Sequence, residues 1–168
     1  MPEQYKQYNI RNAQWQDLDK LAQIEAACFP AAEAATKETL AQRLQIYSKH
    51  FWVLELYDGT IVGFIDGFVT NQAAITDEMF EQPRLHDEAA AYQAVFGLNV
   101  LPDYRGRHYG IALMNALIAN ARMAGRKGCI LTCKENMISY YRKFGYQNQG
   151  LSQSKHGSVV WYDMLLEF

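Results

Sequence analysis

The chain has 168 residues, 49% hydrophobic and 20% charged, a composition that predicts one globular domain over 1–168 with a sizeable core. Its 16 basic and 18 acidic side chains give a net charge of −2, which excludes a broad nucleic-acid-binding surface. Three cysteines are too few for a disulfide scaffold. No apolar run approaches the ~20 residues that span a bilayer, and the N-terminus lacks an apolar signal core. We therefore expect a soluble, cytoplasmic protein with no membrane or nucleic-acid partner.

Apolar periodicity and turn signals predict an alternation of strands and helices. Thr36 is a predicted helix cap, and Asp58-Gly59 between two apolar runs predicts a β-hairpin. Residues 71–92 form a long polar insertion, of a length that is uncommon without a function. The predicted elements are strand 5–11, helices 18–28 and 37–47, strands 51–57 and 61–69, a short helix at 77–80, strand 93–101, helix 109–124, strand 129–133, a short helix at 136–144, and strands 147–151 and 158–166. This order predicts an α/β (α+β) domain with helices on the faces of its sheet.

The segment between the predicted strand 93–101 and the helix that follows it is the most informative part of the chain. Its sequence over 102–111 is Pro-Asp-Tyr-Arg-Gly-Arg-His-Tyr-Gly-Ile. Such a loop exposes backbone N–H groups at the positive end of a helix, which suits a phosphate or pyrophosphate, and Arg105 and Arg107 add full charges. The loop is neither a Walker loop nor a dinucleotide fingerprint. A plain connection between two elements remains an alternative at this point.

A second segment, 135–146, strengthens the functional interpretation of the loop. It contains Asn136, Tyr141 and Gly145 at fixed offsets, about thirty residues after the loop 105–110. Together the two segments resemble the Arg/Gln-x-x-Gly-x-Gly/Ala loop and the Asn…Tyr…Gly-Phe helix end of the GNAT acetyltransferase superfamily. The resemblance covers essentially the whole chain.

Within that superfamily, the segment 25–30 and the insertion 71–92 are most similar to the arylalkylamine (serotonin-type) N-acetyltransferase branch and its bacterial relatives. The resemblance implies a GNAT-like domain with a mixed, mostly antiparallel sheet of about six to seven strands and about four helices. It also implies an acetyl-CoA-dependent enzyme that transfers an acetyl group directly to a small-molecule primary amine. The insertion would form one wall of the acceptor pocket.

The resemblance makes acetyl-CoA the co-substrate and implies no metal. The pyrophosphate would lie on the amides of 107–111, and the pantetheine arm would pair with free backbone groups of Leu98 and Val100 as an added strand does. The cofactor-binding residues that we expect are Leu98, Asn99, Val100, Arg105, Gly106, Arg107, His108, Tyr109, Gly110, Ile111 and Asn136. Asn136 also has an alternative role as the cap of its short helix.

Tyr141 matches the family tyrosine that protonates the departing CoA thiolate, and it is the predicted catalytic residue. The chemistry requires a proton donor near sulfur when the tetrahedral intermediate collapses. Tyr141 also lies on an apolar stripe beside Tyr140, so a purely structural role in the core is the alternative.

The chain departs from the family pattern at two places. His108 stands where the loop usually has its first glycine, which allows close approach of the backbone to phosphate. Serotonin-type enzymes carry two histidines on the central strand that relay a proton from the amine, and Ala94 and Phe96 occupy the matching positions here. Phe96, together with Phe29, is instead a predicted acceptor-binding residue.

The sequence leaves the general base open, although an ammonium group must lose a proton before it can attack. Glu25, Asp66 and His86 are the candidates, and a water chain to solvent is an alternative. Asp66 interrupts an apolar strand, so it requires a partner if it is buried.

Two other functions remain open at the level of the sequence. The missing histidine pair and His108 favour a CoA-binding or sensing module without efficient catalysis. A protein N-acetyltransferase is the other alternative, although the sequence shows no clear acidic groove for a peptide. The aromatic C-terminal strand offers an edge through which a homodimer would form.

Overall fold

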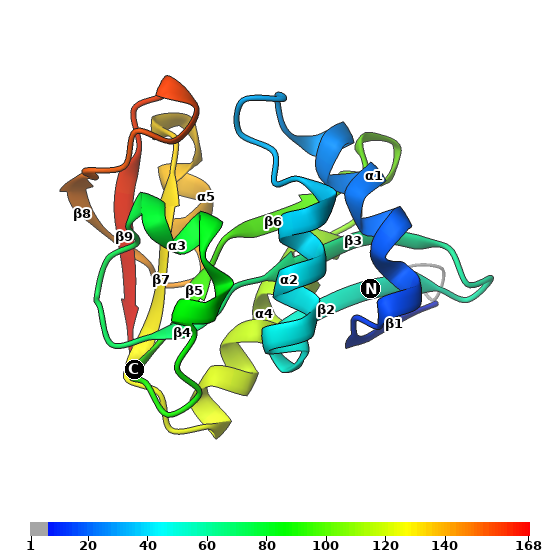
Figure 1. Cartoon of the computed structure of the whole chain (residues 1–168), viewed down its shortest axis with the longest axis horizontal. Coiled ribbons are helices and arrows are strands. Elements are labelled where there is room, and N and C mark those ends of the chain that lie inside the picture. Colours follow the sequence, from blue (N-terminus) through cyan, green and yellow to red (C-terminus); the bar gives the residue numbers. More distant parts are fainter. Residues whose placement is uncertain (1–6) are drawn as a thin grey trace. The chain divides into compact units, whose positions relative to one another are not determined.

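The computed structural model describes residues 7–168, which form two compact units. The first unit contains residues 7–66 and 97–117, and the second contains 67–96 and 118–168. The chain therefore passes repeatedly between the units, and segments far apart in the sequence build each sheet (Figure 1).

The first unit is an antiparallel sheet with strand order β1-β2-β3-β6. Its elements are β1 (Tyr8–Asn12), α1 (Leu18–Cys28), α2 (Lys37–Tyr47), β2 (Phe51–Leu56), β3 (Ile61–Asp66), β6 (Gly97–Val100) and the first part of α4 (Tyr109–Met123). As predicted, the Thr36 hydroxyl caps α2 by accepting the Thr39 N–H at 3.1 Å. The predicted hairpin is also confirmed, with Gly59 at a φ of 91° in the turn between β2 and β3.

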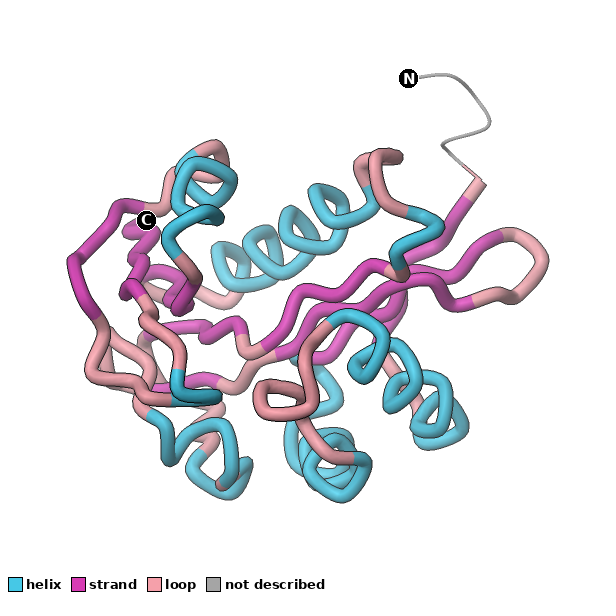
Figure 2. The backbone as a smooth tube through the Cα atoms, turned by 90° about the horizontal axis from the view of Figure 1, so that it is seen from above, coloured by secondary structure: helices cyan, strands magenta, loops and turns pink. Residues whose placement is uncertain are grey.

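Helices cover both faces of this sheet, and Figure 2 shows them on either side of the strands. Helix α1 packs against β3 and β6 on one face. On the opposite face, Leu113 of α4 lies against Gly63 of β3. Strand β3 is buried along its whole length as a result. The polar side chains of this unit that face α1 and α2 are therefore removed from water.

The second unit has a sheet with strand order β4-β5-β7-β9-β8, in which β5 and β7 run parallel and the other pairs run antiparallel. Its elements are β4 (Val69–Thr70), α3 (Asp77–Glu81), β5 (Tyr92–Val95), the end of α4, β7 (Gly128–Cys133), α5 (Ile138–Arg142), β8 (Gln147–Leu151) and β9 (Tyr162–Glu167). The short helix predicted inside the insertion is confirmed as α3.

Two predicted strands are each divided between the two sheets. The run 93–101 gives β5 and β6, with Phe96 between them, and the run 61–69 gives β3 and β4. Close backbone approach explains the break at Gly67, because a Cβ there would stand 1.8 Å from the Ala94 oxygen. The buried Gln93 amide secures this approach by donating to the Gly67 and Ala94 carbonyls at 2.7 and 2.8 Å.

These two breaks turn the seven strands predicted along the chain into the nine strands, in two sheets, of the described residues. The described residues also contain five α-helices, where the resemblance implied about four. The α+β fold class itself is confirmed. Residues 5 and 6 of the first predicted strand lie outside the described residues, and the rest of that strand is β1.

Two further predictions are corrected. Asn136 does not cap a helix, because it lies inside a 3-10 turn (Glu135–Met137) whose N-cap position is Lys134. The C-terminal strand begins at Tyr162 rather than at 158, and it has β7 on one side and β8 on the other. Because both of its edges are paired, it offers no free edge to a second subunit. No helix within residues 7–168 combines the length and apolar character required to cross a membrane.

Candidate active site

Strand β6 forms one edge of the first sheet, with β3 as its neighbour. The Leu101 N–H donates to the Val62 carbonyl at 2.9 Å, so the backbone groups of 97, 99 and 101 face β3. Those of Leu98 and Val100 consequently face outward. An extended ligand that pairs with β6 as an added strand requires backbone groups in this outward orientation.

The Val100 carbonyl at this edge already has two donors from its own unit. The Arg105 Nε donates to it at 2.9 Å and the Cys28 Sγ at 3.4 Å. A ligand group that donates to the Val100 carbonyl must therefore compete with these donors, of which the Arg105 side chain is the exposed one. The sequence contained no signal for this internal pairing.

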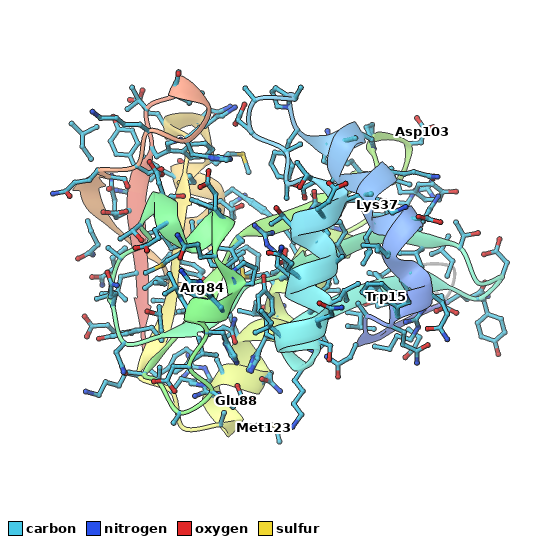
Figure 3. The ribbon with its side chains drawn as sticks, in the orientation of Figure 1. Trp15, Lys37, Arg84, Glu88, Asp103 and Met123 are labelled. Carbon is cyan, nitrogen blue, oxygen red and sulfur yellow. The ribbon has the colours of Figure 1, made fainter. Side chains whose placement is uncertain are left out.

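The loop that follows β6 leads through the turn Pro102–Tyr104, in which Asp103 is exposed (Figure 3), to the start of the 15-residue helix α4. The hydrogen-bond ladder of the helix starts with the Ala112 N–H, which donates to the His108 carbonyl at 3.1 Å. Within the described residues, the N–H groups of 107–111 donate to no protein acceptor. These unused donors at a helix N-terminus fit a pyrophosphate.

Most residues of the loop are exposed to solvent. Arg105, Gly106, Arg107 and His108 are all exposed, and the Arg107 guanidinium lies 5.3 Å from the centre of the Tyr104 ring. Tyr109, by contrast, is buried and packs edge-on to Tyr8 with ring centres 5.6 Å apart. Tyr109 can therefore serve a ligand only through its backbone N–H.

Backbone conformation explains why a glycine is usual at the position of His108. Gly106 and His108 have φ values of 80° and 67°, in the left-handed region that glycine adopts without steric cost. A residue with a Cβ loses about 1–2 kcal/mol there. The chain keeps the loop conformation although the imidazole replaces the glycine.

Replacing His108 by glycine should raise the free energy of unfolding by about 1 kcal/mol, because the left-handed conformation then loses its steric cost. Urea unfolding of His108→Gly beside His108→Ala measures the effect. His108→Ala keeps the Cβ and should not be stabilised. Equal stabilisation of both variants would assign the effect to the imidazole rather than to the backbone.

The second unit holds the predicted catalytic tyrosine on α5. Tyr141 is partly exposed and stacks on Tyr140 at 5.2 Å, while Tyr146 meets it edge-on at 6.1 Å. Burial, followed by the neighbouring Tyr140 and Cys133, raises the pKa of the Tyr141 phenol above its usual value. The phenol therefore stays protonated at neutral pH, the form that a proton donor needs.

Asn136 and Phe96 also belong to the second unit. Asn136 is exposed in the turn before α5. Phe96 meets Phe68 edge-on at 4.8 Å and Phe80 of α3 at 5.3 Å, so an aromatic contact ties the insertion to the end of β5. Ala94 is fully buried in the core. Phe29, the other predicted acceptor-binding residue, ends α1 in the first unit and is partly exposed.

The three base candidates have different surroundings. The His86 Nδ1 accepts the Val69 N–H at 3.0 Å, and its Nε2 lies 3.2 Å from Glu88, so both ring nitrogens hold structural contacts. Asp66 Oδ2 accepts from Arg43 at 3.2 Å and from the Tyr47 hydroxyl. These contacts favour neither His86 nor Asp66 as the proton acceptor.

Glu25 is the candidate whose pKa and hydrogen bonding best suit a base. Its Oε2 accepts the Ala35 N–H at 2.9 Å, while its Oε1 has no hydrogen-bond partner within the described residues. Burial, with help from the charge of Asp66, raises the pKa of Glu25 to about 7. A carboxyl group with that pKa accepts protons efficiently near neutral pH.

Glu25 belongs to a buried polar cluster, which we define as Glu25, Arg43, Tyr47, Asp66 and Asn99. The sequence reasoning missed Arg43, although a signal was available. Arg43 occupies a core position of α2, on the apolar face that also carries Leu40, Leu44 and Tyr47. A charged residue at such a position predicts a buried partner of opposite charge.

Comparisons of the sequence and of the structure with known proteins find similar ones. The family model described as the acetyltransferase (GNAT) family matches residues 18–146. A search of curated proteins finds no match. Among solved structures, the loading GNATL domain of CurA from Lyngbya majuscula superposes with a TM-score of 0.84 at 16% identity, covering 95% of this chain and 97% of that one.

Two other structures show the same fold at low identity. The GphF GNAT-like decarboxylase in complex with isobutyryl-CoA has a TM-score of 0.78 at 22% identity, covering 95% of this chain and 98% of that one. Arabidopsis thaliana Naa50, in complex with the bisubstrate analogue CoA-Ac-MVNAL, has a TM-score of 0.75 at 17% identity, covering 96% of this chain and 99% of that one.

Proposed function

Because the chain belongs to the acetyltransferase (GNAT) family and takes its acetyl group from acetyl-CoA, we propose that its acceptor is the primary amine of a small molecule. Transfer is direct, from the bound thioester to the amine, without an acetylated enzyme. One observation carries the proposal. The free amides at the start of α4 and the outward backbone groups of β6 lie in the same unit and suit the two ends of one CoA molecule.

In the proposed donor site, the amides of 107–111 hold the pyrophosphate, and Arg105 and Arg107 add charge. Leu98 and Val100 pair with the pantetheine arm after Arg105 leaves the Val100 carbonyl. Gly106 and His108 shape the loop through their left-handed backbone. Asn99 has no group at this edge, because its side chain is buried in the polar cluster and its backbone groups face β3.

The proposed chemical step gives Tyr141 the role of general acid. The amine nitrogen bonds to the thioester carbonyl carbon, and the carbon–sulfur bond breaks with its electron pair on sulfur. Tyr141 gives its proton to sulfur and recovers one from the nitrogen that becomes the amide. The ammonium's other proton passes through a base to solvent, so each turnover releases one proton. The motif around Asn136 and Tyr141, rather than a distance, supports these assignments.

The choice of a small amine rests on the similarity of 25–30 and the insertion to the arylalkylamine N-acetyltransferase branch. Phe29 and Phe96 are partly exposed aromatic residues that suit an apolar acceptor. A protein N-terminus is the competing acceptor, since the bisubstrate analogue bound to Naa50 joins CoA to a peptide sequence.

Release of CoA thiol from acetyl-CoA, measured over a panel of small primary amines and N-terminal peptides, tests this choice. We expect turnover with small amines at a kcat/KM at least 10-fold above that of any peptide. A preference for peptides would overturn the small-molecule assignment while leaving the donor site intact.

A further inference from the structure

A charged contact ties the insertion to the loop 152–161, which connects β8 to β9. The carboxylate of Asp77, the first residue of α3, accepts the Ser154 hydroxyl with one oxygen and the Lys155 N–H with the other, the latter at 3.0 Å. Ser154 is buried. We call this contact the Asp77 latch. Because hydrogen bonds to an ionised carboxylate are stronger than neutral ones, the latch fixes α3 against the loop.

The latch is prepared by hydrogen bonds within the loop. The Ser154 oxygen accepts the His156 N–H at 3.3 Å, and the Ser154 N–H donates to the Ser152 hydroxyl oxygen at 3.0 Å. The hydroxyl proton of Ser154 is therefore directed to Asp77. Burial acts to raise the pKa of Asp77, but the hydrogen bonds from Ser154 and Lys155 hold it below its ordinary value. The carboxyl group is thus ionised at neutral pH.

Four aromatic rings form a second connection between the same two segments. Phe96 lies 5.3 Å from Phe80 of α3, Phe80 stacks on His156 at 4.8 Å with their planes 17° apart, and His156 lies 6.3 Å from Trp161. The Trp161 Nε1 also donates to the His156 carbonyl at 2.7 Å. All four residues are partly exposed, and we call them the ring row. Since each ring packs on the next, the place of Phe96 depends on Phe80 and His156.

The ring row belongs to the same unit as the proposed general acid. The Lys134 ammonium lies 5.8 Å from the centre of the Trp161 ring. Cys133, the residue before it, ends β7 and contributes, after burial and Tyr140, to the raised pKa of Tyr141. One end of the ring row therefore adjoins the strand end that also adjoins Tyr141.

We propose that Asp77 and Ser154 are positioning residues for the acceptor, because the Asp77 latch holds His156 against Phe80 and thereby places Phe96. The inference rests on the proposed function, in which Phe96 binds the apolar part of a primary amine. Without the latch, α3 loses its charged connection to the loop and Phe80 shifts with it. An amine with a large apolar body should be affected most, since it contacts more of the ring row than a small amine does.

Asp77→Ala should raise the KM for 2-phenylethylamine by about 10-fold, because misplaced contacts weaken binding of the apolar body. The KM for methylamine should change little, since this amine has no such body. The Kd for acetyl-CoA should stay within about twofold, because the donor loop belongs to the other unit. Glu78→Ala is the matched control. Both residues are exposed on α3, so each variant removes one negative charge without opening a cavity, and Glu78→Ala should behave as the wild type.

A double-mutant cycle tests whether Asp77 and Ser154 act through their shared contact. Ser154→Ala should raise the KM for 2-phenylethylamine as Asp77→Ala does, and the double variant should show no further rise. Asp77→Asn keeps an acceptor oxygen for the Ser154 hydroxyl, so its effect should be smaller than that of Asp77→Ala. Additive effects of the two alanine substitutions would contradict a common latch.

Phe80→Leu tests the next step, from the latch to the ring row. The variant keeps an apolar side chain but removes the stacking on His156, so it should reproduce the loss of preference for 2-phenylethylamine over methylamine. Leu85→Ala removes an exposed apolar side chain from the same insertion and should preserve that preference. Equal losses in the two variants would show that the insertion acts through its apolar surface in general rather than through the ring row.

Calorimetry of 2-phenylethylamine binding to the CoA-saturated protein tests the latch without turnover. Weaker binding by Asp77→Ala than by Glu78→Ala, without thiol release from any amine, would support the latch and overturn the proposed function. Thiol release by the wild type, with a preference between the two amines that Asp77→Ala leaves unchanged while its Tm falls, would show a purely structural role and overturn the inference alone. Equal effects of Asp77→Ala and Glu78→Ala would overturn it as well, because the lost charge would then be the cause.

Discussion

Replacing Tyr141 by phenylalanine should lower kcat by about 100-fold or more, because the proposed mechanism makes Tyr141 the proton donor to the leaving thiolate. The Kd for acetyl-CoA should stay within twofold of the wild-type value, since the role proposed for the hydroxyl group is in the transition state rather than in binding. The phenol is suited to this role because burial keeps its pKa above the usual value, so it carries its proton throughout the neutral range. Steady-state kinetics with saturating amine, together with calorimetry of acetyl-CoA binding, measure the two quantities separately.

Tyr140→Phe is the matched control for this experiment. Tyr140 stacks on Tyr141 at 5.2 Å and on Phe144 at 5.5 Å, so both variants remove one hydroxyl group from the same aromatic group. We expect Tyr140→Phe to change kcat by less than about threefold. If the two variants lose the same activity, or if Tyr141→Phe retains full turnover, the general-acid role is wrong.

Gly67→Ala should destabilise the protein by on the order of 4 kcal/mol or more, the largest stability effect that we expect from a single methyl group. The added Cβ would stand 1.8 Å from the Ala94 oxygen and 2.4 Å from the Ala94 carbonyl carbon, both of them backbone atoms that cannot turn aside. Relief requires the chain around β5 to move away, which breaks the Gln93 hydrogen bonds to the Gly67 and Ala94 carbonyls. Chemical denaturation monitored by circular dichroism gives the free energy of unfolding.

Gly106→Ala provides the control for this substitution. A Cβ at Gly106 meets nothing within 4 Å, so the variant bears only the cost of a φ of 80°. That cost is about 1–2 kcal/mol. A loss for Gly67→Ala no larger than the loss for Gly106→Ala would contradict the close backbone approach at Gly67.

Local features of the fold could be predicted from the sequence, because short-range chemistry determines them. The Thr36 cap, the Asp58-Gly59 turn and the helix after the basic loop each depend on residues close together in the chain. The breaks at Gly67 and Phe96 could not be predicted in this way. They arise because two distant segments meet at Gly67 and Ala94, and an apolar run carries no signal for such a contact.

The candidate site, like the fold, combines features that could be predicted from the sequence with features that could not. The loop 105–110 and Tyr141 were found from motif spacing, and the free amides at the start of α4 follow directly from the position of the loop before a helix. The pairing of Arg105 with the Val100 carbonyl and the Asp77 latch are tertiary contacts. Asp66 was recognisable as a polar residue in an apolar strand, but its partner Arg43 became evident only in the folded chain.

Transfer of a labelled acetyl group from acetyl-CoA to a small primary amine tests the central claim most directly. We expect the label in the N-acetylated amine, with one equivalent of CoA thiol released per product and no label on the protein when the amine is omitted. Tight binding of acetyl-CoA without transfer to any amine, or a labelled protein intermediate on the path to product, would contradict direct acetyl transfer to a small primary amine.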